Sequence, residues 1–178
     1  MNRGYHEIKE HGKREFPFNI YPCSIPVDFS HVALHWHEEM EIIAVKKGKG
    51  RITVDTVSYP VEEGDILAVF PGQLHAISCG NGERMEYENI IFRLSMLMGD
   101  NGDGCTVHFL KPLQEGQAKN PVLIQRNQPD HEVFGKVIQE LDRFSEIRGN
   151  GYQLAVKGQL FLFLYYAYGR GILFTEKK

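Results

Sequence analysis

The sequence predicts a mainly β protein, a small β-barrel followed by two C-terminal α-helices, on the strength of three observations. Short apolar segments separated by Gly-rich turns fill residues 31–111, a spacing typical of barrels and sandwiches. After about residue 120 the apolar residues recur at helical spacing instead. The length of 178 residues, with 42% hydrophobic and 24% charged residues, fits one folded domain with a helical appendage.

Residues 1–30 are expected to form an arm that carries one or two edge strands. The segment is polar at first and then becomes rich in aromatic residues and prolines, namely Phe16, Pro17, Phe18, Tyr21, Pro22 and Pro26. Proline cannot donate a hydrogen bond to a neighbouring strand, so such segments lie at sheet edges. The first residues lack the apolar stretch of a secretory signal, and we expect a cytoplasmic chain.

Charge and cysteine content exclude several functional classes. The net charge of −3 and the pI of about 6.2 leave no basic stripe, so this chain by itself is a poor candidate for binding nucleic acid. The three cysteines are widely spaced and form no C-x-x-C motif, which argues against a disulfide framework and favours a reducing compartment. The longest apolar stretch, residues 160–168, is too short to span a membrane.

Residues 31–118 are expected to form the barrel. The KGKG sequence at 47–50 is typical of a hairpin turn, and Gly64 and Pro71-Gly72 mark two further turns. The expected strands, in order, are residues 32–48 (as one strand or two), 51–57, 66–70, 85–97 and 105–113.

Residues 119–178 are expected to form a helical linker and dimerisation segment. The first helix covers 131–148, with Asp130 as N-cap and Gly149 as the residue after its end. Its inward residues recur at helical spacing and are Phe134, Val137, Ile138, Leu141 and Phe144. The second helix, within 151–171, is almost apolar all round from Leu160 onward and must be buried. A partner chain is the simplest way to bury it, so we expect a homodimer through these helices.

The strongest chemical signal is an H-x-H pair followed by a glutamate. His35, His37 and Glu41 are all odd-numbered, and side chains of one parity share a face of a strand. If the strand continues without a bulge, all three project to the same side. Trp36 has the opposite parity, and we expect it to pack on the outer face against the helices or the arm.

A second segment supplies a fourth candidate ligand. The strand at 66–70 leads into Pro71-Gly72, a bend that directs His75 back towards the first three residues. Three imidazoles and one carboxylate suit a divalent transition metal such as Zn, Ni, Fe or Mn, with coordination positions left for water or a ligand.

Three further residues are candidates for ligand binding. Tyr87 and Phe92 lie on a later strand, and their aromatic rings suit a sugar or a planar effector if they line the cavity. Arg93 offers forked donors to a carboxylate or phosphate, and a surface salt bridge is its simpler alternative role.

The two segments resemble the paired motifs of the cupin superfamily. The first motif matches from His35 to Gly48, although Phe29 stands where its leading Gly would be. The second matches at Gly64, Gly72 and His75, with its Pro displaced to Pro71 and Cys79 in place of its final Asn. The resemblance implies a cupin-type (jelly-roll) barrel, and the departures weaken an enzymatic interpretation.

Residues 15–170 also resemble the N-terminal effector-binding part of AraC-type transcriptional regulators. The order of arm, barrel and two helices agrees, and HWHEEMEIIAVKKGKGRITVDTVSYPVEEGDILAVFPGQLHAI carries the likeness. This resemblance implies dimerising helices followed by a helix-turn-helix DNA-binding domain. That domain does not appear in these 178 residues, so we expect a sensor domain taken from a longer regulator, or a stand-alone relative of one.

We therefore expect a non-enzymatic sensor that binds a small molecule, such as a sugar, near His35, His37, Glu41 and His75, with a metal allowed but not required. Binding would order the arm or shift the helices, and the dimer would pass the change to DNA-binding domains. Two alternatives stay open. One is a metal-dependent cupin enzyme, a dioxygenase or isomerase, that uses the same four residues. The other is a dimerisation module with an empty barrel.

Overall fold

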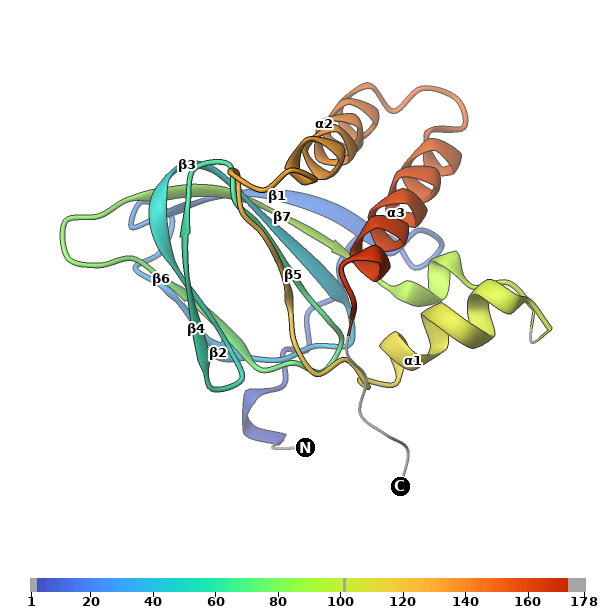
Figure 1. Ribbon diagram of the computed structural model, residues 1–178, viewed down its shortest axis with the longest axis horizontal. Coiled ribbons are helices and arrows are strands. Elements are labelled where there is room, and N and C mark those ends of the chain that lie inside the picture. Colours follow the sequence, from blue (N-terminus) through green and yellow to red (C-terminus); the bar gives the residue numbers. More distant parts are fainter. Residues whose placement is uncertain (1–2, 101, 173–178) are drawn as a thin grey trace.

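The computed structural model describes residues 3–100 and 102–172, and within them antiparallel strands dominate the N-terminal two thirds (Figure 1). The mainly β architecture with C-terminal helices is confirmed. Within the described residues the eight strands are β1 Phe18–Ile25, β2 Val32–His35, β3 Met40–Val54, β4 Val57–Glu62, β5 Ile66–Val69, β6 His75–Ser78, β7 Met85–Phe92 and β8 Val122–Ile124.

One long strand, β3, belongs to both layers of the barrel. Its first half pairs with β7 and β5 in a layer of order β1-β7-β3-β5-β8, and its second half pairs with β4 and β6. The other layer is completed by β2, which pairs with β6. Between Val45 and Lys47 the register with β7 shifts, and the strand turns from one layer into the other.

Successive side chains along a strand point to opposite faces, so the strands contribute to two separate apolar cores. On β3, the odd residues Ile43 and Val45 pack between the two layers, in a cluster that also contains Leu67, Ile77 and Tyr87. The even residues Met40, Ile42 and Ala44 face the other way and pack against the helices. Residues of both sets are at most 4% exposed, so the space between the layers is filled by side chains.

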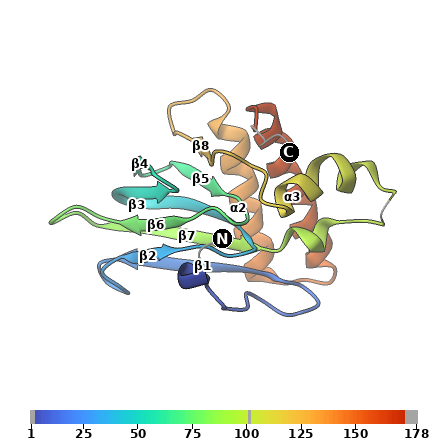
Figure 2. The same ribbon diagram turned by 90° about the horizontal axis from the view of Figure 1, so that it is seen from below.

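The helices of the described residues are the 3₁₀ helices η1 Arg3–Tyr5 and η2 Leu94–Leu97, the π-helical turn η3 Thr106–Leu110, and the α-helices α1 Lys111–Gln114, α2 His131–Ile147 and α3 Tyr152–Gly169. All the helices except η1, which belongs to the N-terminal arm, pack against the outer face of the β1-β7-β3 layer, and α2 and α3 cover most of it (Figures 1 and 2). The predicted inward residues Phe134, Val137, Ile138 and Leu141 of α2 are buried, whereas Phe144 is only partly so. Among the described residues, no helix is both long and apolar enough to cross a membrane.

An ion pair fastens the end of α3 to the start of α2. The guanidinium of Arg170 donates to both carboxylate oxygens of Asp130 at 2.6 and 2.7 Å, and to the Leu123 carbonyl oxygen at 3.0 Å. Asp130 does occupy the N-cap position of α2, but it makes no side-chain capping bond there. Its carboxylate serves the tertiary contact instead.

Three sequence expectations are wrong, namely the KGKG hairpin, the strand at 105–113 and a C-terminal segment without strands. The KGKG segment makes no hairpin, because β3 runs through it to Val54 and the chain reverses at Asp55 and Thr56 instead. The segment 105–113 is helical, and the strand that completes the β1-β7-β3-β5 layer is β8, inside the range expected to be helical. At the end of α2 Gly149 does follow the C-cap, as predicted, and the C-cap Arg148 is itself left-handed. The last six residues of the segment expected to be helical, 173–178, lie outside the described residues.

Candidate metal and effector site

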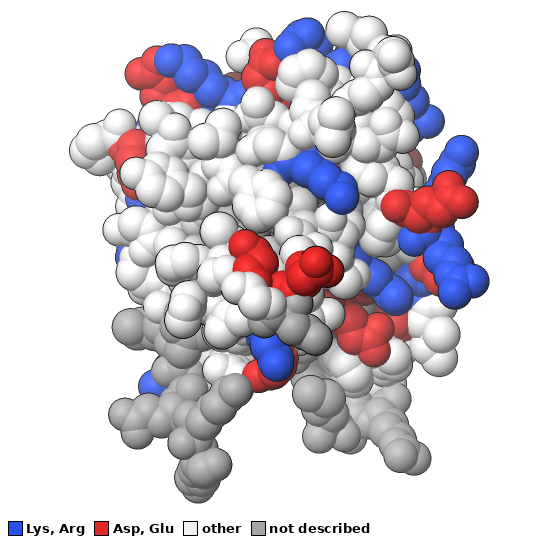
Figure 3. All heavy atoms as spheres, turned by 90° about the vertical axis from the view of Figure 1, so that its right-hand side faces the viewer, with Lys and Arg blue, Asp and Glu red and all other residues white. Residues whose placement is uncertain are grey.

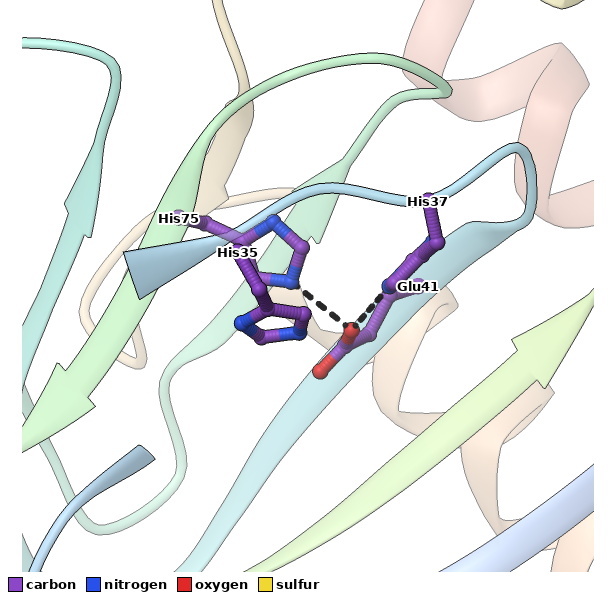
Figure 4. A group of neighbouring side chains, drawn as sticks. All are labelled: His35, His37, Glu41 and His75. Carbon is purple, nitrogen blue, oxygen red and sulfur yellow. Dashed lines mark hydrogen bonds and ion pairs between the residues drawn. The ribbon is translucent and has the colours of Figure 1, made fainter. Parts of the chain in front are cut away.

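Four side chains from three strands and one loop converge between the layers (Figure 4). His35 ends β2 and is directly opposite His75, the first residue of β6, while Glu41 is the second residue of β3. His37 lies in the irregular segment between β2 and β3. One donor atom from each of the four side chains lies within 4.8 Å of all the others. The structure thus brings together the four residues predicted as ligands.

The hydrogen bonds fix which nitrogen of each imidazole faces inward. Nδ1 of His35 donates to the Ala33 carbonyl at 2.9 Å, and Nδ1 of His75 donates to the Gln73 carbonyl at the same distance. Nδ1 of His37 donates to the Glu39 carbonyl at 3.1 Å. A carbonyl only accepts, so each Nδ1 carries the proton and each Nε2 is left to face the cluster.

Glu41 is the centre of the cluster. Its Oε2 atom lies 3.0 Å from Nε2 of His37 and 3.1 Å from Nε2 of His75. A carboxylate and a neutral Nε2 are both acceptors, so these contacts require a proton on each Nε2 or a cation among the three atoms. Glu41, His37 and His75 are at most 3% exposed, so water cannot screen the arrangement.

Burial and neighbouring charges have opposite effects on the pKa values of Glu41 and His37, whereas both lower the pKa of His35. Burial alone would raise the pKa of Glu41, but the charge of His75 and the hydrogen bonds from His37 and His75 lower it well below its usual range. Burial likewise disfavours a charged His37, yet the hydrogen bond to Glu41 and the nearby carboxylates raise its pKa. Burial and the charge of His75 lower the pKa of His35.

The donor set fits a divalent transition metal. Ligating histidines commonly donate their second ring N–H to a carbonyl, which fixes the tautomer and directs the other nitrogen at the ion. All three imidazoles meet this condition, and the carboxylate adds an anionic oxygen. His35, His37, Glu41 and His75 would hold the ion, and bound there it would act as a Lewis acid with open positions for a ligand.

The N-terminal arm lies over this cluster. The backbone N–H of Glu7 donates to the Trp36 carbonyl at 2.9 Å, and the N–H of Trp36 donates to the Tyr5 carbonyl at 2.8 Å. The ring of His6 stacks on Trp36, with centroids 4.2 Å apart and 20° between the planes. Trp36 therefore packs against the arm, one of the two placements predicted from its parity.

The arm adds two side chains to the group that the sequence did not indicate. Oε2 of Glu7 lies 3.7 Å from Nε2 of His35 and 3.9 Å from Nε2 of His11. His11 is 5% exposed and its Nδ1 lies 3.2 Å from the Tyr21 hydroxyl. The ion-pair contact with His11 foremost, and then the charges of His35 and His37, lower the pKa of Glu7. Both residues stand in a polar segment without periodicity, so no pattern distinguished them.

The other predicted ligand residues divide between the two faces of β7. Tyr87 lies between the layers with Val45 and Ile77, and its hydroxyl has no hydrogen-bond partner among the described residues. Phe92 faces the helices and is fully buried there, so the expectation that it lines the cavity is wrong. Arg93 donates from Nε to Glu39 at 2.7 Å, an ion pair that ties β7 to the segment holding His37.

The described residues thus form a two-layer antiparallel barrel with an inward cluster of three histidines and a glutamate, an arrangement that can hold a small molecule or a metal ion. Residues 26–164 match the family model described as the AraC-like ligand binding domain. The chain belongs to this family.

The related proteins described next are at most 27% identical to this chain. The uncharacterized HTH-type transcriptional regulator YdeC of Bacillus subtilis (strain 168) is 27% identical over 88 residues, which cover 49% of this chain and 30% of that protein. A cupin protein from Bacteroides fragilis is 26% identical, with a TM-score of 0.36 over 46% of this chain and 67% of that one. A single-residue mutant of oxalate decarboxylase OxdC from Bacillus subtilis is 25% identical, with a TM-score of 0.33 over 35% and 18% of the two chains.

Proposed function

We propose that this domain senses a small polar molecule, such as a sugar, and relays its binding to a DNA-binding domain. The observation that carries the proposal is the arm closed over a convergent set of polar side chains, in a chain of the AraC-like ligand-binding family. Similarity to a helix-turn-helix regulator supports the relay.

The geometry supports a specific coupling between ligand and arm. His37, Glu41 and His75 are at most 3% exposed, and the space below them is filled by apolar side chains. A ligand larger than an ion therefore reaches the cluster only when the segment around Glu7 and His11 moves. Effector binding and arm position are then linked, because a ligand shifts a conformational equilibrium by its difference in affinity for the two states.

The helices support a homodimer in this proposal. On α3 the residues Leu154, Phe161 and Tyr165 follow one another at spacings of seven and four, and they are 78%, 39% and 71% exposed. Phe109 of η3 is also 47% exposed and lies against Tyr168, with ring centroids 5.1 Å apart. Uncharged side chains cover much of this face in Figure 3. A second copy that packs its own α3 here would bury these side chains.

A thermal-shift screen of neutral sugars and small organic acids, with and without Ni²⁺ or Zn²⁺, tests the proposal. We expect at least one compound to raise the unfolding temperature, and the double variant His37→Ala, Glu41→Gln to remove that rise. The variant His108→Ala, which changes an exposed histidine outside the cluster, is the control. A hit that is equally strong in the double variant would contradict a sensing site at the cluster.

A metal-dependent enzyme is the second candidate, favoured by one observation: the tautomers of all three histidines are fixed with Nε2 inward. A sensor that binds its effector directly has no need of that arrangement. Turnover of oxalate, catechol or a keto sugar by the metal-loaded chain, lost in the double variant, would support the enzyme. Binding without product formation would support the sensor.

A further inference from the structure

A groove separate from the four-residue cluster lies between the barrel and α2. It has a volume of about 590 Å³, within the range of small-molecule sites, and shares none of its lining residues with the cluster. Its walls are the arm at Gly12 to Phe16, the helix-facing residues of β1, and the C-terminal half of α2.

The inner wall of the groove is short of positive charge. Glu88 of β7 and Asp142 of α2 share a single ammonium, because Nζ of Lys46 lies 2.6 Å from Oε2 of Glu88 and 3.0 Å from Oδ2 of Asp142. The two carboxylates are 22% and 24% exposed, so their charges are only partly screened by water. Burial, together with the charge of Asp142, raises the pKa of Glu88 in spite of Lys46.

Two residues of the same wall each carry a buried oxygen that has no hydrogen-bond partner among the described residues. The two oxygens are Oδ1 of Asp142 and Oγ of Ser145, which lie three residues apart on α2 and therefore on one face of the helix. Buried polar atoms are nearly always paired, and an unpaired one is costly. Both oxygens are buried, and a rotation of either side chain would bring its oxygen to the groove, where an N–H donor of a ligand would satisfy it.

The opposite end of the groove is aromatic. Phe16 contacts Phe18 and Tyr152, with ring centroids 5.6 and 5.7 Å apart. Rings at these distances form a corner that suits the apolar body of a ligand, and their faces attract a cation. The remaining charged residues of the lining, Lys13, Glu146 and Arg148, are exposed and of mixed sign, so water and salt weaken their influence.

We propose that this groove binds an organic ammonium compound with an apolar or aromatic body. The ammonium group would lie between Asp142 and Ser145, and the body would lie against Phe16, Phe18 and Tyr152. Because the groove joins the arm to α2, such a ligand would hold these two elements together. This site is additional to the effector site proposed above.

Calorimetric titration with three matched probes tests the charge requirement. The probes are 2-phenylethylamine, 2-phenylethanol and 3-phenylpropanoate, which are similar in size and differ in charge. We expect the amine to bind at least about tenfold more tightly than the alcohol, and the carboxylate to bind more weakly still. Equal binding of the amine and the alcohol, or an amine dissociation constant weaker than about 10 mM, would overturn the proposal.

Variants locate the site. Asp142→Asn is expected to weaken amine binding by about tenfold, and Ser145→Ala, which leaves the Lys46 ion pairs intact, by about threefold. Glu132→Gln, which changes an exposed carboxylate of α2 outside the groove, is the matched control and should change the affinity by less than about twofold. Unfolding temperatures establish that each variant is folded. Unchanged affinity in folded Asp142→Asn and Ser145→Ala would place the amine elsewhere, as would a loss caused by His37→Ala.

Discussion

The Oε2 atom of Glu41 lies 3.1 Å from Nε2 of His75, although the two residues are 34 positions apart in the chain. The same oxygen lies 3.0 Å from Nε2 of His37. Since the Nδ1 atoms already carry protons, this buried group holds either additional protons or a metal ion. The two states make opposite predictions for the effect of pH, and both are accessible to measurement.

The first prediction concerns metal content. The purified chain is expected to bind one equivalent of Ni²⁺, Zn²⁺, Fe²⁺ or Mn²⁺, and His75→Ala to bind none. At an ion concentration of about 100 times Kd, binding contributes about 2.7 kcal/mol to the free energy of unfolding, or about 5 to 10 °C in Tm for a chain of this size. Elemental analysis and thermal unfolding measure both effects. Full retention of metal in His75→Ala would show that the ion lies elsewhere.

The second prediction is the pH dependence of the metal-free chain. The lowered pKa of Glu41 stabilises the fold above about pH 4.3, and this contribution is lost as the pH falls towards the folded-state pKa. The raised pKa of His37 stabilises the fold below about pH 6.5, and this contribution is lost as the pH rises through the folded-state value. The pair therefore stabilises the chain most between about pH 4.3 and 6.5.

Urea unfolding from pH 5 to pH 8 in EDTA, at steps of about one unit, checks this prediction. The free energy of unfolding of the native sequence should fall towards pH 8, and Glu41→Gln should flatten that fall. With Zn²⁺ present the trend should reverse, because a metal binds the neutral imidazoles and competes with protons. The same slope with and without metal would refute the assignment.

The third prediction uses the single tryptophan of the chain as a probe of the arm. The ring of His6 stacks on Trp36 only while the arm is docked, so His6→Ala should alter the emission of Trp36. Since these are exposed or half-buried contacts, Tm should change by no more than about 2 °C. His31→Ala, in an exposed loop, serves as the control. Emission that is identical in His6→Ala and the native chain would show that the arm is not docked in solution.

The fourth prediction concerns self-association. Tyr165 is 71% exposed on the apolar face of α3, and Tyr165→Glu should convert a dimer into a monomer in light-scattering measurements at micromolar concentration. A charge left unpaired in an apolar interface is strongly unfavourable. Gln153→Glu adds the same charge at an exposed position of α3 and should leave the dimer intact. A native chain that is monomeric at this concentration would disprove the helix-mediated dimer.

Periodic segments were predictable because burial imposes their pattern. The alternation in β3 and the spacing of Phe134, Val137, Ile138 and Leu141 in α2 both follow from one buried face. His35, His37 and Glu41 were predicted to converge because odd-numbered residues share one face of a continuous strand. They do converge, but the strand is interrupted, since β2 ends at His35 and β3 begins at Met40. The segment from Trp36 to Glu39 is irregular, and the Nδ1 bond of His37 to the Glu39 carbonyl orients that ring.

Features set by tertiary contacts were not predictable. Gly48 has a φ of +79°, and a Cβ there would collide with the carbonyl of Arg84, so this glycine allows close approach of the neighbouring chain rather than a reversal. The strand β8 has three residues, too few to show a period, and it forms because β5 offers an unpaired edge. Glu7 and His11 become part of the site only through the pairing of the arm with Trp36.

The sharing of β3 between both layers decides where a reporter domain can be inserted to make a biosensor from this chain. An insertion within Met40–Val54 would cut the pairing of both layers at once, and it would separate Glu41 from the rest of its strand. The turn at Asn81 and Gly82, between β6 and β7, is exposed and has no side chain within reach of a Cβ on Gly82. A fluorescent protein placed there would stay outside both cores and move with β7, the strand that carries Arg93 at its end.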